Sequence, residues 1–365
     1  MAGKFSRKSF VDINLNDKFF DSLKKDYPGN EFSRSFIEWF HNKATDGKKA
    51  LVFEDDEGVG AFVNLKPSEI EAIRLQDGTT LPAVNRMKIT TIKIDERYRN
   101  RRIGEGAIGL TLWYWRDSGA NEIYVTVFDK HASLISLLEK YGFTHVGNNM
   151  NGERVYVKDR RDIDFNDPCK AFPFLSNKID HAGCLAIDMT YHDTMFASSE
   201  LANTLQKRID ISVANGLKKV YLGSPYSLAF EVGDPIFIYR RYTGDQGQPG
   251  YKSCITSYCL VTKIVKVKDN GRELISYDEY RKIIGNKSVY DDYELKTKFD
   301  TFPNLTLIEL LYYGYFGAGN NVNWMWLKNN NCWPSTHPMN FRYSREQFDK
   351  IMKEGKVDVS NVVIY

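Results

Sequence analysis

The stretch Arg101-Arg102-Ile103-Gly104-Glu105-Gly106-Ala107 decides how the first half of the chain is expected to fold. A run typical of a β-strand, KITTIKI from Lys88, precedes it, and a run typical of a helix, AIGLTLWYWRD, begins at Ala107. The two glycines let the backbone come close to a ligand, and the N-terminus of a helix carries roughly half a positive charge. The stretch therefore predicts an anion site that suits a phosphate or a pyrophosphate.

The strand before this loop changes the phase of its apolar residues. Ile89 stands at an odd position, whereas Ile92 and Ile94 stand at even positions. Because successive side chains of a strand point to opposite faces, such a slip predicts a β-bulge. The helix after the loop is expected to bury one apolar stripe, made by Ile108, Leu112 and Trp115.

The spacing Arg-x-x-Gly-x-Gly/Ala in this loop resembles the acyl-CoA pyrophosphate loop of the GNAT superfamily of N-acyltransferases. That family has a bulge in the strand before the loop. The runs EIYVTVF and HASLISLLEKYGF resemble its later strand, its later helix and the closing Gly-Phe turn. The expected element order over about residues 8–160, β-α-α-β-β-β-α-β-α-β, is that of a GNAT fold, a mixed central sheet flanked by helices. An unrelated α/β phosphate loop is the alternative.

The resemblance implies a binding site for acetyl-CoA. Backbone N–H groups of the loop would hold the pyrophosphate, arginine side chains would either assist or only solvate the loop, and the bulged strand would offer main-chain groups to the pantetheine and the thioester. The implied cofactor-binding residues are Ile92, Ile94, Arg99, Arg101, Arg102, Ile103, Gly104, Glu105, Gly106 and Ala107.

The acid and base of such a transfer are less clearly marked. Many GNAT members place a tyrosine in the later helix as the acid, and Leu138 stands at that position here. Tyr141, Asp95 and His131 are the catalytic candidates. A packed aromatic is the competing interpretation of Tyr141, and a family member can also use water in place of a base.

Composition and length bound the rest of the interpretation. The chain has 365 residues, of which 42% are hydrophobic and 27% charged, and its net charge is +3. These values predict a folded protein of two domains and neither demand nor exclude nucleic acid. Five cysteines without C-x-x-C spacing predict reduced thiols and no metal site. Because no apolar leader or apolar run of ~18 residues is present, we expect a cytoplasmic protein.

The second half is expected to be a separate domain rich in strands. A charged run, KDRRDIDFND, and then Pro168 and Pro173 predict a linker at 161–182 between domains at 1–160 and 183–365. The strands are expected in CLAIDM, KKVYLG, DPIFIYRR, ITSYCLVTKIVKV and TLIELLYYG. Ser276 is expected to cap one helix, and Ser344 with Gln347 another that ends at Gly355. Together the two halves predict an α+β chain whose second domain is a small barrel.

The runs YHDTMF, GDPIFIYRR, ITSYCLV, IIGNKSVYDDYEL and SREQFDKIM resemble PUA-like domains of the ASCH and EVE type. The ASCH signature Gly-x-Lys-x-x-Glu-x-Arg is not present, so the subfamily stays open. The resemblance implies a β-barrel that binds RNA or modified bases through aromatic stacking. The implied binding residues are Tyr191, His192, Arg240, Arg241, Trp324, Trp326 and Trp333, with Tyr239 and Lys252 as further candidates and a core position as the alternative for any single tryptophan.

The two resemblances together imply an acetyl-CoA-dependent N-acyltransferase. Its acceptor would be an amine linked to nucleic acid, such as an aminoacyl-tRNA or a modified base, and the second domain would deliver it. A protein or small-molecule acetyltransferase with a structural barrel is one alternative, and a non-catalytic sensor of CoA and nucleic acid is another. A homodimer is a further implied assembly. Release of CoA distinguishes an enzyme from a sensor.

Overall fold

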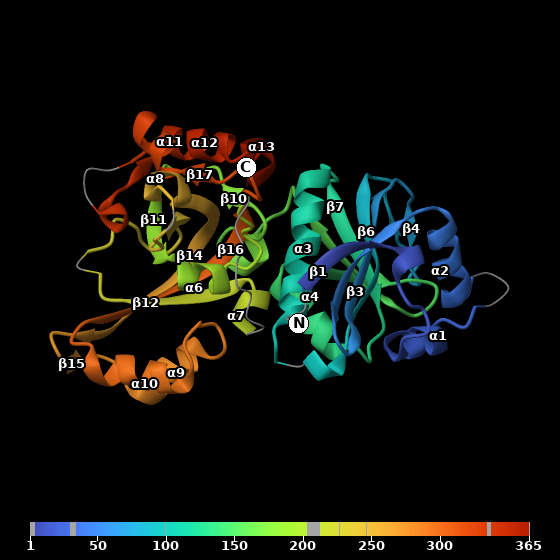
Figure 1. Cartoon of the computed structure of the whole chain (residues 1–365). Coiled ribbons are helices and arrows are strands. Elements are labelled where there is room, and N and C mark those ends of the chain that lie inside the picture. Colours follow the sequence, from blue (N-terminus) through green and yellow to red (C-terminus); the bar gives the residue numbers. More distant parts are fainter. Residues whose placement is uncertain are drawn as a thin grey trace. The chain divides into compact units, whose positions relative to one another are not determined.

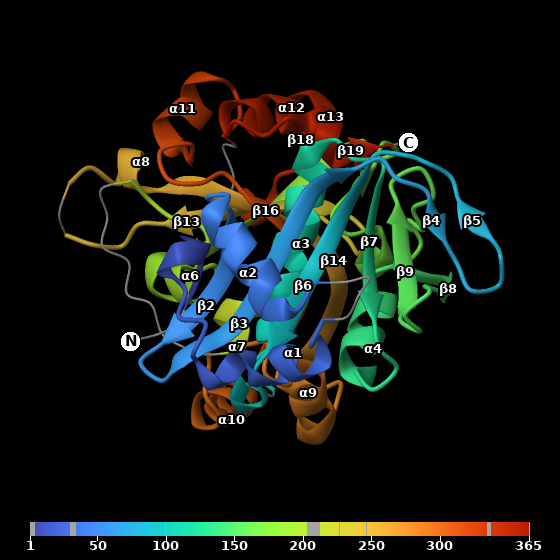
Figure 2. The same ribbon diagram turned by 90° about the vertical axis from the view of Figure 1, so that its right-hand side faces the viewer.

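The computed structural model describes residues 4–29, 34–98, 100–202, 212–225, 227–245, 247–333 and 337–364. The chain packs as two compact units, shown in Figures 1 and 2. The first contains residues 1–139 and 143–162, and the second contains residues 140–142 and 163–365.

A seven-stranded mixed sheet forms the centre of the first unit. Its strands, in spatial order, are β1 (Lys4–Ser9), β2 (Lys49–Asp55), β3 (Gly58–Glu69), β6 (Arg86–Ile94), β7 (Glu122–Val127), β9 (Arg154–Asp159) and β8 (Thr144–Asn148). Among the described strands of this sheet, β6 and β7 pair in parallel and the other neighbours pair antiparallel. A short hairpin of β4 (Ile73–Arg74) and β5 (Thr80–Leu81) is inserted before β6.

Four α-helices flank this sheet. They are α1 (Asp21–Asp26), α2 (Phe36–Thr45), α3 (Ile103–Ser118) and α4 (Ala132–Lys140). Helices α1 and α2 lie on one face, and α3 lies on the other (Figures 1 and 2). The predicted apolar stripe of α3 is fully buried at Ile108, Leu112 and Trp115. The GNAT-type mixed sheet is therefore confirmed, although two strands, β8 and β9, follow α4 where the expected order had one.

The second unit is built on a larger mixed sheet. Its main strands, in spatial order, are β12 (Lys218–Gly223), β16 (Leu305–Tyr315), β14 (Cys254–Asp269), β13 (Pro235–Arg241), β11 (His181–Asp188) and β18 (Tyr343–Ser344). Strands β15 (Arg272–Glu273) and β17 (Val322–Asn323) pair with β14, and β10 (Leu175–Ser176) pairs separately with β19 (Val363–Ile364). Within the described residues no pairing joins β12 to β18, so the sheet is not closed into the predicted barrel.

The helices of the second unit are short. They are α5 (Pro168–Ala171), α6 (Met189–Met195), α7 (Ser212–Asn215), α8 (Pro249–Lys252), α9 (Tyr277–Ile284), α10 (Asp292–Thr301), α11 (Trp324–Asn329), α12 (Arg345–Glu354) and α13 (Val359–Val362). Ser276 caps α9 by accepting the Glu279 N–H at 3.2 Å. Ser344 and Gln347 form a capping box at α12, which ends before Gly355. Both capping predictions are confirmed.

The segment predicted as a linker is folded onto the second unit. Phe172, Phe174 and Leu175 are buried, and the Tyr313 hydroxyl donates to the Pro168 carbonyl oxygen at 3.0 Å. The charges that suggested a linker are engaged as well, since Arg161 pairs with Glu122 at 2.9 Å. In this chain, the segment that follows the charged run is therefore packed against other residues of the second unit.

All five cysteines are buried. In the described parts of the chain, no group of three or more His, Cys, Asp or Glu side chains could hold a metal ion. Over the same residues, no helix is both long enough and apolar enough to cross a membrane.

Candidate active site

A β-bulge at Thr90 sets the geometry of the candidate site. In the pairing of β6 with β3, Thr91 lies opposite Asn64 and Ile89 lies opposite Leu65, so Thr90 is an extra residue. The extra residue moves Ile92 and Ile94 to the face that Ile89 occupies. The bulge predicted from the apolar phase of this strand is confirmed.

The bulge coincides with the point where β6 leaves β7. The parallel pairing runs from Arg86 opposite Glu122 to Ile89 opposite Val125, whereas pairing with β3 continues to Ile94 opposite Ala61. In the described chain, residues 90–94 therefore have no ladder partner on the β7 side. Backbone N–H and C=O groups on that edge are available to a ligand, and Ile92 and Ile94 lie in this stretch.

The glycine loop follows directly and starts α3 at Ile103. Its N-cap residue, Arg102, has a left-handed backbone with φ of 59°. The Gly106 N–H donates to the Arg102 carbonyl oxygen at 3.1 Å, so the N–H groups of Ile103, Gly104 and Glu105 precede the first intrahelical donor. A Cβ at Gly104 would lie 3.5 Å from Leu137 Cδ2 and 3.9 Å from Ile94 Cγ1. Gly104 thus lies between α4 and the divergent end of β6.

Arg102 is held over this helix terminus by Glu105. Its Nε and Nη2 atoms lie 2.9 and 2.8 Å from Glu105 Oε2, and the two side chains are 9% and 10% exposed. The third guanidinium nitrogen, Nη1, is buried and has no hydrogen-bond partner among the described residues. A buried cationic donor without an acceptor, next to helix N–H groups, is suited to an anion.

The other two arginines of the loop contribute differently. The Arg101 guanidinium is exposed and lies 5.7 Å from the centre of the Tyr98 ring. Arg99 lies outside the described residues. Glu105, which was predicted only as part of the backbone loop, instead has a side-chain function in holding Arg102.

Asp95 follows β6 directly and is engaged in local structure. Its carboxylate accepts the Arg97 N–H at 3.0 Å, its N–H donates to the Gly60 carbonyl at 2.9 Å, and its carbonyl accepts the Tyr98 N–H at 3.1 Å. These contacts cap the single 3-10 turn Glu96–Tyr98. Its placement favours a structural role over that of a base.

His131 directly precedes α4 and lies among charged groups, which are Lys130, Asp26 of α1 and Lys93 of β6. Burial, followed by the charge of Lys130, lowers the pKa of His131, while Asp26 opposes the shift and Lys93 adds to it. The imidazole is therefore neutral near pH 7 and able to accept a proton. Lys93, on the divergent end of β6, donates to Ser22 Oγ at 2.7 Å in α1. The fold thus brings α1, β6 and the start of α4 together, which no local pattern in the sequence indicates.

Tyr141 and Leu138 are both fully buried. The Tyr141 ring packs edge-on against Phe172, with ring centres 5.8 Å apart. This placement favours the interpretation of Tyr141 as a packed aromatic rather than as a solvent-facing acid.

The predicted binding residues of the second unit separate into three places, and the first is a buried network. His192 is completely buried. Its Nδ1 lies 2.9 Å from Asp193 Oδ1, and its Nε2 lies 2.8 Å from Thr256 Oγ1. Arg240, which is 3% exposed, holds both oxygens of Asp193 at 2.7 and 2.9 Å. Burial opposes ionisation of Asp193, but hydrogen bonds from Arg240 and His192 outweigh it and lower the Asp193 pKa. Arg240 and His192 are therefore engaged in the core and do not present themselves to a phosphate or a base.

The second place is an aromatic cluster of Tyr239, Trp324 and Trp333. The Tyr239 and Trp333 ring centres are 4.6 Å apart, and those of Trp324 and Trp333 are 6.4 Å apart. Lys328 Nζ lies 5.2 Å from the centre of the Trp324 ring. Trp326, in the same helix, is partly exposed.

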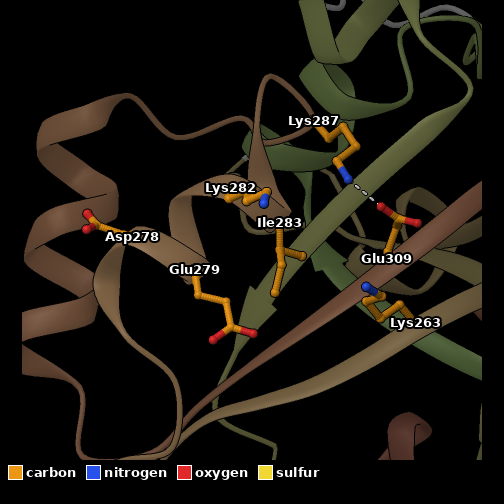
Figure 3. Close-up of a pocket in the computed structure, with 7 residues that line it drawn as sticks. All are labelled: Lys263, Asp278, Glu279, Lys282, Ile283, Lys287 and Glu309. Atoms are coloured by element: carbon orange, nitrogen blue, oxygen red, sulfur yellow. Dashed lines mark hydrogen bonds and ion pairs between the residues drawn. The ribbon is translucent and has the colours of Figure 1, made fainter.

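The third place is a cavity of about 490 Å³ that includes Tyr191 and Arg241 among its lining residues. A second, more open hollow of about 660 Å³ is shown in Figure 3. Three lysines and three carboxylates line that hollow, and Lys287 is paired with Glu309.

Comparison with known proteins assigns the first unit. Residues 16–143 match the acetyltransferase (GNAT) family, and the match does not extend into the second unit. No curated protein matches the chain.

Solved structures similar to this chain align with less than half of it. An N-acetyltransferase from Staphylococcus aureus Mu50 is 16% identical, with 44% of this chain and 99% of that chain covered and a TM-score of 0.31. The PaiA N-acetyltransferase from Thermoplasma acidophilum, in complex with coenzyme A, is 14% identical over 44% of this chain and 99% of that chain, with a TM-score of 0.30. Arabidopsis thaliana NAA60, in complex with acetyl-CoA, is 19% identical over 43% of this chain and 99% of that chain, with a TM-score of 0.29.

Proposed function

Because residues 16–143 form a GNAT acetyltransferase domain, we propose that this protein is an acetyl-CoA-dependent N-acetyltransferase whose acceptor is an amine linked to nucleic acid. An aminoacyl-tRNA or a modified base is such an acceptor, and the second unit binds it. The observation that carries the acetyl-CoA site is the divergence of β6 from β7 at the Thr90 bulge, directly before the glycine loop.

The residues present fit acetyl-CoA. The first-turn N–H groups of α3 and the unpartnered Nη1 of Arg102 would hold the pyrophosphate, and the edge of β6 at Ile92 and Ile94 would bind the pantetheine amides. Acetyl-CoA supplies the activated acetyl group as a thioester. We assign the cofactor site to Ile92, Ile94, Arg101, Arg102, Ile103, Gly104, Glu105, Gly106 and Ala107.

The chain's contribution to the reaction is then positional and electrostatic. An N–H on the divergent edge of β6 would donate to the thioester oxygen, where negative charge develops as the amine nitrogen attacks. The C–N bond would form as the C–S bond breaks, and the leaving thiolate would take up a proton from water. His131 is our candidate to accept the proton from the amine, since its lowered pKa leaves the imidazole neutral near pH 7.

The nucleic-acid part of the proposal is supported by the second unit's partly exposed aromatic rings. Trp324 and Trp333 lie beside each other, and Lys328 adds a cation at the same cluster. Stacking surfaces next to cations are typical of proteins that bind single-stranded nucleic acid.

Transfer of labelled acetyl from acetyl-CoA to charged tRNA, total RNA and bulk protein tests the proposal, with Gly104→Glu as the blocked variant and Gly104→Gln as its uncharged match. We expect label in charged tRNA or RNA, strongly reduced by Gly104→Glu. Label in protein alone would show that the acceptor is a protein amine and not an amine linked to nucleic acid. Binding of acetyl-CoA without any transfer would show that the protein is a sensor and not an enzyme.

A further inference from the structure

We propose that the cavity of the second unit lined by Tyr191, Tyr221 and Tyr290 binds a single nucleotide, with the base against the exposed ring of Tyr191 and a phosphate at Arg241. This inference deepens the proposed function, because it locates where a nucleic-acid acceptor is held. It can fail while the acetyltransferase activity stands, and the reverse also holds.

The cavity has the size and the position of a small-molecule site. Its volume is about 490 Å³, within the range of roughly 300–1,000 Å³ usual for such sites. It is lined by the end of β11 at Ile187 and Asp188, by α6 at Tyr191 and Met195, and by the end of β12 at Tyr221 and Leu222. The other lining residues are Ala186, Ser224, Pro225, Ser227, Arg241, Val289, Tyr290, His337, Met339 and Asn340.

Three tyrosine rings form part of its walls. The Tyr191 and Tyr290 ring centres lie 5.2 Å apart with their planes at 57°, so the two rings form a corner rather than a closed stack. Tyr191 is 39% exposed and belongs to a lining of both apolar and polar residues. A partly exposed ring at the edge of a cavity offers a stacking surface to a planar ligand.

The polar groups of the cavity match the edge of a base rather than a lipid or a carboxylic acid. Asn340 accepts the Ser227 hydroxyl at 3.0 Å through Oδ1, which leaves its amide group as a donor. His337 accepts the Met339 N–H at 3.3 Å through Nδ1, which leaves Nε2 as a further polar atom. Donors and acceptors set among apolar side chains read the hydrogen-bonding edge of a flat heterocycle.

Arg241 is the arginine among the described residues of this lining. Its guanidinium is 56% exposed and is oriented by an ion pair with Asp188. Because an arginine held in place by one carboxylate still has several N–H donors, it can bind a phosphate at the rim. Arg240, its neighbour in sequence, is buried on Asp193 and does not compete for this role.

Calorimetric titration of the full chain with nucleoside monophosphates, with the matching nucleosides and with ribose 5-phosphate tests the inference. We expect wild type to bind at least one monophosphate more tightly than ribose 5-phosphate. Tyr191→Ala should weaken that binding by roughly tenfold or more, whereas Tyr191→Phe, which keeps the ring, should stay near wild type. Arg241→Ala should weaken the monophosphate but not the nucleoside.

Tyr293→Ala is the matched control, because Tyr293 is 80% exposed on α10 and does not line the cavity. Equal binding by Tyr191→Ala and Tyr293→Ala, or no binding of any monophosphate by wild type, would overturn the inference. Unchanged KM for a nucleic-acid acceptor in Tyr191→Ala would overturn it as well. Loss of binding in Tyr191→Ala with intact acetylation of protein would keep the cavity's assignment and reject the nucleic-acid acceptor.

Discussion

Asn64 and Thr90 bind each other across the bulge of β6. Asn64 Nδ2 donates to Thr90 Oγ1 at 2.5 Å, and Thr90 Oγ1 donates to the Asn64 carbonyl oxygen at 3.1 Å. Asn64 is 3% exposed, so this pair is part of the interior of the sheet. The extra residue of the bulge thus satisfies a buried amide while it directs the end of β6 away from β7.

Thr90→Val should therefore disturb the acetyl-CoA site without reaching it directly. Valine keeps the shape but removes the hydroxyl and leaves a buried amide unpaired, which costs about 1–3 kcal/mol. We expect a lower melting temperature and a KM for acetyl-CoA raised by about tenfold. Thr91→Val, one residue along the same strand, is the control. Equal KM values in the two variants would show that the bulge does not shape the site.

Substitution of Arg102 separates the contribution of its guanidinium to anion binding from the effect of its left-handed backbone on stability. Both Arg102→Gly and Arg102→Ala remove the guanidinium, but only glycine adopts the left-handed φ of 59° without cost. Each variant should weaken acetyl-CoA binding by about tenfold in calorimetry, and the alanine variant should be less stable than the glycine variant by roughly 1–2 kcal/mol. Undiminished binding in both variants would exclude Arg102 as a ligand of the pyrophosphate.

The bulge and the loop could be predicted because both are local patterns. An apolar phase that slips between Ile89 and Ile92 marks an extra residue wherever one face of a strand is buried. The helix caps at Ser276 and Ser344 are local for the same reason.

Other features depend on residues far apart in the chain. Arg240 donates to Asp193, which is 47 positions away in the sequence. No local sequence pattern predicts this pairing, which removes both side chains from the surface. The cavity at Tyr191 likewise needs Tyr221 and Tyr290 from separate elements. The charged run before Pro168 does not predict that Phe172 and Phe174 are buried, because charge density reports solvation alone.

Tyr141→Phe should leave catalysis nearly intact. The ring is fully buried against Phe172, so removal of the hydroxyl keeps the packing. We expect kcat within about twofold of wild type, while Tyr141→Ala should destabilise the protein by about 3–5 kcal/mol. Measurement of kcat as a function of pH for wild type and Tyr141→Phe tests this prediction. A kcat that falls by orders of magnitude in Tyr141→Phe, with loss of one limb of the pH profile, would identify Tyr141 as the acid.

Glu309 should make the stability of the second unit depend on acid pH. Burial opposes its ionisation, but the hydrogen bond from Lys287 and the charges of Lys218 and Lys287 outweigh it and lower its pKa to about 2 (Figure 3). Because this pKa lies below the value of about 4.5 expected for the unfolded chain, the stabilisation is complete above pH 4.5 and disappears as pH falls toward 2.

Glu309→Gln should accordingly melt below wild type near pH 6 and approach it near pH 2. Thermal unfolding at pH values between these limits measures the difference. Glu279→Gln, from the same hollow, is the control and should follow wild type throughout. A difference between wild type and Glu309→Gln that stays constant with pH would contradict the assignment.

Calorimetry of acetyl-CoA binding to wild type, Gly104→Gln and Gly104→Glu tests the central claim most directly. Both side chains begin with a Cβ at an ordinary contact distance of 3.5 Å from Leu137, and a carboxylate in the first turn does not destabilise a helix. We predict that Gly104→Glu binds at least tenfold more weakly than Gly104→Gln, and that added salt narrows this gap because it screens repulsion from the pyrophosphate. Equal affinity of all three proteins for acetyl-CoA would show that the loop after β6 is not the cofactor site.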